Sequence, residues 1–412
     1  MTAQLFSNPT TFEQLHVGPL KTHIAAYARW LSAQGYARAT AREHLQLLSH
    51  LSQWCEQRQV TGNDLSEQQL RPFLQQRQDQ SRVPRSNMTI LTQFLEVLRE
   101  VGMLPAATVA SEQSNGQGWV HNYAHYLVHE RGLASATVAS YLPIVQRFLN
   151  TRFGTEAIDL AALTARDASR FLLDHTPAVS PKRAKLIVSA LRSFLRFLYQ
   201  RGGLATDLAL SLPAVADWRL SSLPKFIAPD EVERLLQSCD QTHPTGRRDY
   251  AILLLLARLG LRAGEVVAMT LEDLDWTAGE LTVRGKGGRR DRLPIPPEVG
   301  QALATYLRHG RPSCQTRRVF VRMKAPRQGF TDHRAISTLV HRALTRAGLA
   351  PALKGAHLLR HSLATQMLRG GASLAEIGDL LRHQSPMTTE SYAKVDQTAL
   401  AALAHPWLGE EA

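Results

Sequence analysis

Cysteine is scarce in this sequence of 412 residues: only Cys55, Cys239 and Cys314 occur, far apart and odd in number. No two of them form a C-x-x-C pair. This usage argues against a disulfide framework and against a zinc ribbon, both of which need paired cysteines. We therefore expect a protein of a reducing compartment.

Long apolar runs are also missing. The longest, at 252–257, is far shorter than the roughly 20 residues that cross a bilayer. The N-terminus has neither the basic start nor the apolar stretch of a secretion signal. We expect no membrane partner and a cytoplasmic location, associated with the nucleoid if DNA is the partner.

Acidic residues are fewer than basic ones: the chain has 35 Asp and Glu residues and 48 Lys and Arg residues, for a net charge of +13. Residues 1–110 carry +2, residues 111–225 carry +5 and residues 226–412 carry +6. This surplus predicts a polyanionic partner, although charge alone does not separate DNA from RNA or an anionic membrane. The length favours two or three domains over a single core.

Two stretches of the N-terminal half resemble each other. Residues 35–51 share five identities with residues 132–148, and residues 91–102 similarly match residues 191–202. The pattern predicts a duplicated helical module over about 20–108 and 118–212. Chance similarity between short amphipathic helices with Gly-Ala turns is the alternative. The stretches 104–117 and 212–224 read as linkers.

The two copies differ in charge. Lys185, Arg192 and Arg196 fall on one face of the last helix of the second copy, and such a basic stripe suits DNA phosphates. A solvated helix surface is the alternative for any one of them. The first copy has Gln93, Glu96 and Arg99 at similar places, which predicts that it binds DNA weakly or binds protein instead.

The last part of the chain carries residues suited to cutting a DNA phosphodiester without a metal. Such a reaction needs cations on the non-bridging oxygens, a nucleophile, and an acid for the departing sugar oxygen. Six residues, spaced by 24, 71, 3, 23 and 9 positions, offer these functions: Arg262, Lys286, His357, Arg360, His383 and Tyr392.

Arg262 follows a buried helix in a glycine-containing turn, where its planar fork could grip two phosphate oxygens. Glu265, one turn later, could hold that guanidinium as structural support. Lys286 lies in the turn of a predicted hairpin, 281–284 and 291–295, where it could protonate a 5′ oxygen. Four nearby arginines would lower its pKa and contact DNA: Arg284, Arg289, Arg290 and Arg292.

His357 and Arg360 are three residues apart on a predicted helix and so could bind one phosphate together. His361 follows His357 at i+4, a spacing that could also indicate a zinc site. No Glu completes H-E-x-x-H, and Arg360 would repel a cation, so we expect no metal. For His361 itself the sequence favours a packing or capping role.

His383 ends a helix that begins at Ser373, whose capping box is completed by Glu376. Ser385 and a following proline predict another helix, with Tyr392 two turns into it. A phenol has a pKa near 10, so a positive cluster must stabilise its phenolate before it can attack.

In this order, the motifs ARLGLRAGEV, RGKGGRRDRLPI, HLLRHSLATQML, LLRHQS and TTESYAKV resemble the tyrosine recombinase (phage integrase) family, most closely its Xer-like branch. The resemblance covers about residues 118–412. Leu259 and Gly264 depart from residues common in the family, and neither is one of the six chemical positions. The first helical copy has no counterpart in the compact Xer proteins, which leaves its role open.

The resemblance implies an activity and the roles of its residues. Tyr392 would form a 3′-phosphotyrosyl link, with Arg262 and Arg360 on the phosphate oxygens. His357 and His383 would be further donors, and Lys286 the general acid. No cofactor is expected, and double-stranded DNA with a specific recombination site would be the partner. A homo-tetramer, or a mixed tetramer with related recombinases, would act on two sites, with a helix between Asp396 and Trp407 docking into a neighbouring subunit.

The expected fold is mainly α with a small β-sheet in the catalytic domain (α+β). Its parts would be an extra helical module at 1–110, a core-binding helical DNA-binding domain at 111–220 and a catalytic domain at 221–412. Two rival functions are relaxation by a type IB topoisomerase and non-catalytic DNA-binding regulation. The extra module favours a mobile element, although integration, transposition and resolution all remain open.

Overall fold

A computed structural model describes residues 18–62, 65–80, 86–105, 117–154, 158–215, 224–285, 289–383 and 385–395. The described residues divide into two compact units, one holding those between Ala107 and Ser221 and the other holding the rest. Three large apolar cores are formed, from residues 20–104, 123–212 and 227–359. The three-domain division remains a prediction.

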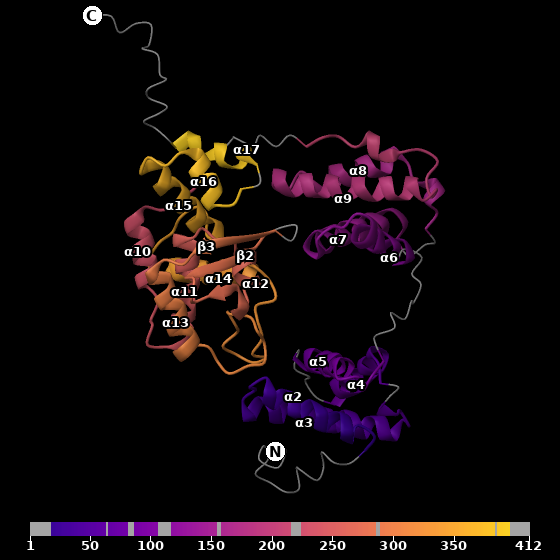
Figure 1. Ribbon diagram of the computed structural model, residues 1–412. Helices are drawn as coiled ribbons and strands as arrows, with labels where there is room; N and C mark the ends of the chain where they lie inside the picture. Colours follow the sequence, from indigo (N-terminus) through magenta and orange to yellow (C-terminus); the bar gives the residue numbers. More distant parts are fainter. Residues whose placement is uncertain are drawn as a thin grey trace, which may run out of the picture. The chain divides into compact units, whose positions relative to one another are not determined.

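The segment before residue 106 is helical (Figure 1). Its helices are α2 (Lys21–Ala33), α3 (Arg38–Gln57), α4 (Glu67–Gln80) and α5 (Ser86–Glu100). Apolar residues recur at helical spacing along these helices and face the core. Among them, Leu45, Leu48, Phe94 and Leu98 are completely or almost completely buried. Tyr27 lies edge-on to Phe94, with their ring centroids 5.3 Å apart.

The unit between Ala107 and Ser221 repeats this arrangement. It contains α6 (Gln117–His125), a π-helical turn (Tyr126–Glu130), α7 (Ser135–Phe153), α8 (Ala165–His175) and α9 (Pro181–Gln200). Tyr123 lies edge-on to Phe194 at 5.1 Å, as Tyr27 does to Phe94. The amphipathic helix expected around residues 191–198 is confirmed as part of α9.

Matching glycines adopt the same backbone conformation in both segments. Gly35 and Gly132 have φ of +73° and +59°, and Gly102 and Gly202 have φ of +72° and +71°. These left-handed values suit glycine, which has no β-carbon to clash. Tyr123 precedes Gly132 by one residue more than Tyr27 precedes Gly35. The π-helical turn accommodates this additional residue, because its hydrogen bonds join residues five apart and not four apart as in an α-helix. These correspondences support a duplicated helical module.

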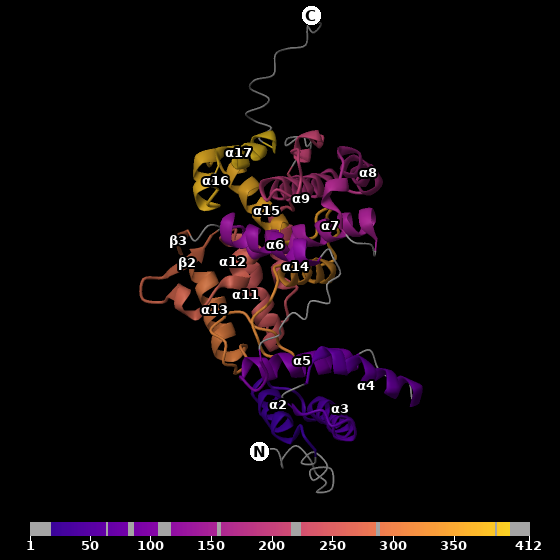
Figure 2. The same cartoon turned by 90° about the vertical axis from the view of Figure 1, so that its right-hand side faces the viewer.

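The segment after residue 224 is also mainly helical, and most of its helices surround one core. Its α-helices are α10 (Pro229–Gln237), α11 (Pro244–Arg258), α12 (Ala263–Ala268), α13 (Pro297–His309), α14 (Arg334–Arg346), α15 (Ala356–Arg369), α16 (Leu374–Leu380) and α17 (Pro386–Thr389). Residues 251–256 of α11 are completely buried. α15, α16 and α17 lie together in both views (Figures 1 and 2), and α16 contacts both of the others.

A three-stranded antiparallel sheet accompanies these helices. Its order is β1 (Leu274–Asp275), β2 (Glu280–Arg284), β3 (Arg290–Pro294). Leu281 pairs with Leu293 and both are buried, whereas Thr282 pairs with the exposed Arg292. This alternation is that of a sheet with one face on a core. The predicted hairpin is confirmed, and so is the expected α+β class.

The described helices include none that is both long and apolar enough to cross a membrane.

Candidate active site

Arg262 stands at the start of α12, where the preceding turn places it. α11 ends at Arg258, and Gly260 turns the chain with φ of +57°. A β-carbon at Gly260 would lie 2.5 Å from Cδ2 of Leu381, so the close packing also requires glycine. The side chain of Arg262 remains 38% exposed, which leaves its guanidinium accessible to a ligand.

Glu265 fixes Arg262 through both its carboxylate oxygens. Nη1 of Arg262 donates to Oε1 at 2.8 Å, and the backbone N–H of Arg262 donates to Oε2 at 2.8 Å. The side chain of Glu265 is only 6% exposed, so this support comes from inside the protein. The contact expected between these two residues is therefore present.

Arg360 lies on α15 and joins two loops of the site. It is buried, and its guanidinium donates to the carbonyl oxygens of Gly260 and Leu381. Burial, and then the charges of Arg262 and Arg382, lower the pKa of Arg360 to about 10. Arg360 thereby ties the turn before Arg262 to the residue before Arg382.

The two histidines of α15 differ in exposure. His357 is exposed, while His361 is half-buried, with their ring centroids 6.3 Å apart. Nδ1 of His361 lies 2.8 Å from the phenolic oxygen of Tyr392. This contact differs from the packing or capping role expected for His361, because the fold brings the 386–395 segment against α15.

His383 follows α16, which begins at Ser373 with the expected capping box to Glu376. Nδ1 of His383 lies 2.7 Å from the Thr389 hydroxyl, and its ring is parallel to that of Tyr392 at 6.5 Å. Burial first, and then the charges of Arg360 and Arg262, lower the pKa of His383 to about 4. The imidazole is therefore neutral near pH 7.

Tyr392 is in a 3₁₀ helix (Glu390–Val395) that follows the short α17. The continuous α-helix expected here is wrong, since the chain tightens after Thr389. Tyr392 is only 2% exposed and packs with Ala364, Ile377 and Leu381. Burial raises the pKa of Tyr392 to about 12, against the opposing effect of Arg360.

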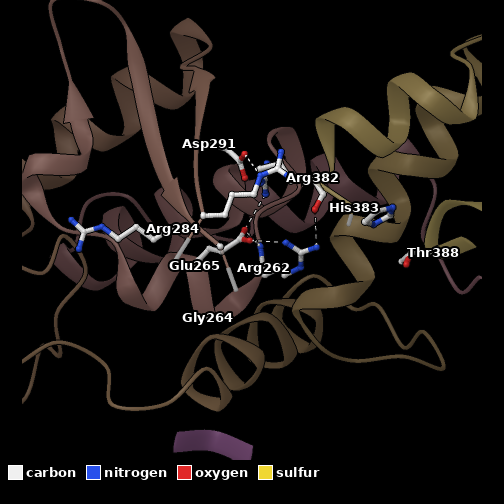
Figure 3. Close-up of a pocket in the computed structure, with 10 residues that line it drawn as sticks. Arg262, Gly264, Glu265, Arg284, Asp291, Arg382, His383 and Thr388 are labelled. Carbon is white, nitrogen blue, oxygen red and sulfur yellow. Dashed lines mark hydrogen bonds and ion pairs between the residues drawn. The ribbon is translucent and has the colours of Figure 1, made fainter. Parts of the chain in front are cut away.

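A cleft of about 460 Å³ opens beside these residues (Figure 3). Its described lining is mostly cationic or glycine: Arg262, Gly264, Glu265, Arg284, Gly285, Arg289, Asp291, Arg382, His383 and Thr388. Figure 3 shows Glu265 reaching Arg262, whose guanidinium also donates to the carbonyl oxygen of Arg382 at 3.3 Å. An anion of phosphate size suits this lining.

Lys286 lies outside the described residues, which end on either side of it at Gly285 and Arg289. Three of the hairpin arginines have carboxylate partners in the structure. Arg284 pairs with Asp273 at 2.8 Å, Arg289 with Asp291 at 2.7 Å, and Arg292 with Glu280 at 3.6 Å. Arg290 is exposed.

The basic stripe of α9 is partly engaged within its own unit. Lys185 and Arg196 are exposed. Nη2 of Arg192 donates to the carbonyl oxygen of Leu212 at 2.9 Å, so this arginine also anchors the chain after α9.

The sequence did not point to Arg382 or Thr389, nor to the contact made by His361. Arg382 is buried, has φ of +55° and donates to Glu265. Its position directly before His383 was the available signal. The spacing of His361 from His357 likewise placed both on one helix face.

Comparisons with known proteins show the family to which the chain is related. Residues 225–399 match the model of the phage integrase family, and residues 120–202 match that of the phage integrase N-terminal SAM-like domain. An integrase/recombinase of Sinorhizobium fredii, y4rA, is 41% identical over 394 residues, covering 95% of this chain and 96% of the relative. Tyrosine recombinase XerD of Lacticaseibacillus casei is 30% identical, covering 70% and 97%.

Solved structures share the fold. XerH recombinase bound to its difH substrate after cleavage superposes with a TM-score of 0.54 at 17% identity, covering 72% of this chain and 90% of that one. A lambda integrase dimer bound to a core site gives 0.52 at 18% identity, covering 72% and 99%.

Proposed function

The chain belongs to the phage integrase family of site-specific tyrosine recombinases, and on that premise we propose that Tyr392 is the nucleophile that cleaves and rejoins DNA. One observation carries the proposal: Arg360 bonds the carbonyls of Gly260 and Leu381, which brings Arg262 and His383 to the neighbourhood of Tyr392.

Arg262 is the residue best suited to bind the scissile phosphate. Its guanidinium is partly exposed in the cleft and is oriented by Glu265, so little rotational freedom is lost on binding. Arg360 adds positive charge from a buried position, where the field of a charge is less screened than in water. Both would stabilise charge on the non-bridging oxygens as the phosphorus is attacked.

The chemical step transfers the phosphate to the protein. The phenolic oxygen of Tyr392 bonds to phosphorus, the bond to the 5′ oxygen breaks, and a 3′-phosphotyrosyl link remains. His361 is positioned to accept the phenolic proton, while Lys286 is proposed to protonate the departing 5′ oxygen. Attack by a 5′ hydroxyl of either strand reverses the step, so bond energy is conserved.

His357 and His383 are proposed as further donors to the phosphate. His383 would use the ring nitrogen that does not face Thr389, since Nδ1 lies 2.7 Å from that hydroxyl. Tyr392 is 2% exposed, so a phosphodiester can reach its oxygen only after the segment from Pro386 to Val395 shifts.

Residues outside the cleft are proposed to hold the duplex. The exposed Lys185 and Arg196 of α9 suit backbone phosphates, with Arg192 as a further contact. From the hairpin we assign Arg284, Arg289, Arg290 and Arg292 to DNA binding. Those with carboxylate partners would exchange them for phosphate.

A recombination site on double-stranded DNA is the proposed partner, and the active assembly is a tetramer, alone or mixed with related recombinases. Similar solved structures are of recombinases and integrases bound to DNA, which supports the first point. The predicted exchange helix, 396–407, lies outside the described residues. The cytoplasmic location follows from this substrate and remains part of the proposal.

The module at 1–110 is proposed as a third clamp element or a contact to partner recombinases, beside domains at 111–220 and 221–412. The relative y4rA aligns over 95% of this chain, whereas XerD aligns over 70%. The additional module itself is what favours a mobile element's recombinase over chromosome dimer resolution. Deleting residues 1–108 should reduce the DNA footprint or the size of the complex. An unchanged footprint together with an unchanged complex would contradict both roles.

The test of Tyr392 uses a duplex nicked near the cleavage point, with the site first mapped by footprinting on the ends of the host element. Wild-type protein should accumulate a covalent adduct, while Tyr392→Phe should bind equally well and form none. Adduct formation by the Phe variant would refute the assignment. Mixing two sites separates recombination from relaxation by a type IB topoisomerase, which needs one.

A further inference from the structure

Arg382 occupies a backbone position that favours glycine. It follows α16 with φ of +55°, and the described residues contain one other non-glycine with positive φ, Gln59 at +56°. In this conformation a residue with a β-carbon is strained relative to glycine. The turn closes through backbone bonds from Arg382 N to Asp379 O and from His383 N to Gly378 O, which glycine would make equally well.

The side chain of Arg382 carries a second cost, because it is charged and only 4% exposed. Its Nη1 donates to the carbonyl of Leu380 at 3.0 Å, and its Nη2 donates to Oε2 of Glu265 at 3.0 Å. Within the described part of the chain, its buried Nε has no hydrogen-bond partner. Local folding therefore explains neither the residue type nor its burial.

Glu265 is the group through which Arg382 reaches the reaction centre. One carboxylate oxygen accepts from the Arg262 guanidinium and the other accepts from Arg382. A single negative charge is thus divided between two guanidinium groups in a cleft that both of them line. Without Arg382, the described partner left to this carboxylate would be Arg262.

We propose that Arg382 is a positioning residue for DNA cleavage: it shares Glu265 with Arg262 and so keeps Arg262 from being neutralised before the scissile phosphate arrives. This inference rests on the proposed role of Arg262. The surplus cation stays inside the cleft at the point where the phosphate gains charge in the transition state. Arg382 itself acts without touching the phosphate.

The test compares three variants in single-turnover adduct formation on the nicked duplex. Arg382→Gln removes the charge and keeps much of the side chain, and we expect it to slow cleavage about tenfold or more, less than the hundredfold or greater loss of a direct oxyanion donor. Arg382→Lys should stay within about threefold of the wild-type rate, because it keeps the positive charge beside Glu265. DNA affinity should change little.

A substrate change separates charge from structure. In a second duplex a methylphosphonate replaces the scissile phosphate, so that one charged oxygen becomes a methyl group. The rate ratio of Arg382→Gln to wild type should rise toward one on this duplex, because the methylphosphonate is neutral before attack and its transition state carries one negative charge fewer than that of the phosphate. A purely structural defect would slow both substrates equally.

Stability controls accompany the rates. Arg382→Gly relieves the left-handed backbone and carries the same rate prediction if the Gln variant folds poorly. Gln59→Gly, far from the six chemical positions in sequence, reports the effect of the same backbone relief alone. Cleavage by folded Arg382→Gln at the wild-type rate, or equal slowing of the Gln and Lys variants, would overturn the proposal. Adduct formation by Tyr392→Phe would instead overturn the proposed function on which it rests.

Discussion

The phenolic oxygen of Tyr392 lies 2.8 Å from Nδ1 of His361. The phenol is otherwise packed among apolar side chains of α15 and α16, and burial raises its pKa to about 12. At neutral pH the proton therefore stays on the oxygen unless a partner accepts it during attack. We propose His361 as that partner, with its contact to the phenol kept while the segment from Pro386 to Val395 shifts to admit the phosphate.

We predict that His361→Ala slows adduct formation on the order of a hundredfold, the usual contribution of a general base. His361→Asn can offer a hydrogen-bonding group near the position of Nδ1 but cannot take the proton. It should preserve thermal stability better than the Ala variant while remaining slow. Single-turnover cleavage and thermal melting check this, and a fast Asn variant would show that His361 only orients the phenol.

Two arginines should separate catalysis from stability. Arg262 is partly exposed, so Arg262→Gln should lose cleavage by about a hundredfold or more with little change in unfolding free energy. Arg360 is buried and serves two carbonyls, so Arg360→Gln should lose cleavage and also about 2 kcal/mol of stability. Denaturant titration beside the cleavage assay tests the contrast. Equal stability losses would contradict it.

The pKa of His383 predicts an acid-sensitive contribution to stability. It is lowered to about 4 in the folded chain from 6.5, so between these pH values the unfolded chain binds more protons. This contribution is complete above pH 6.5 and is lost as the pH falls toward 4. Compared with wild type, His383→Asn should show a shallower loss of stability over that range in melts at a series of pH values. Parallel curves would argue against a neutral, buried His383.

The helical repeat predicts equal costs at two glycines. Gly102 and Gly202 have φ of +72° and +71°, and a β-carbon at either would meet nothing within 4 Å. Ala at each site should therefore cost only the backbone strain of about 1 kcal/mol. Hydrogen exchange of core amides in α5 and α9 of the full chain measures each module separately. Markedly unequal losses of stability for the two Ala variants would contradict the equivalence of the two turns.

Features coded by neighbouring residues were predictable from the sequence. The capping box of Ser373 and Glu376 and the β2–β3 hairpin both depend on local signals. The convergence of residues from Arg262 to Tyr392 does not follow from local signals, and its prediction relied on the ordered motifs and their family resemblance.

Features set by tertiary packing escaped prediction. The left-handed Arg382 contradicts local preference and is offset by Glu265, 117 residues away in sequence. The His361 contact depends on how the 3₁₀ helix of Tyr392 meets α15, and the π-helical turn at Tyr126–Glu130 depends on keeping Tyr123 against Phe194. In each case the deciding partner lies far along the chain.

Mapping the DNA–protein bond tests the central claim most directly. The adduct formed by wild-type protein on the nicked duplex is digested with trypsin and nuclease, and the peptide that carries nucleotide is sequenced by mass spectrometry. We predict peptide 383–394, whose single tyrosine is Tyr392, with the nucleotide esterified through its 3′ phosphate to that phenol. Attachment at any other side chain, or through a 5′ phosphate, would contradict the account.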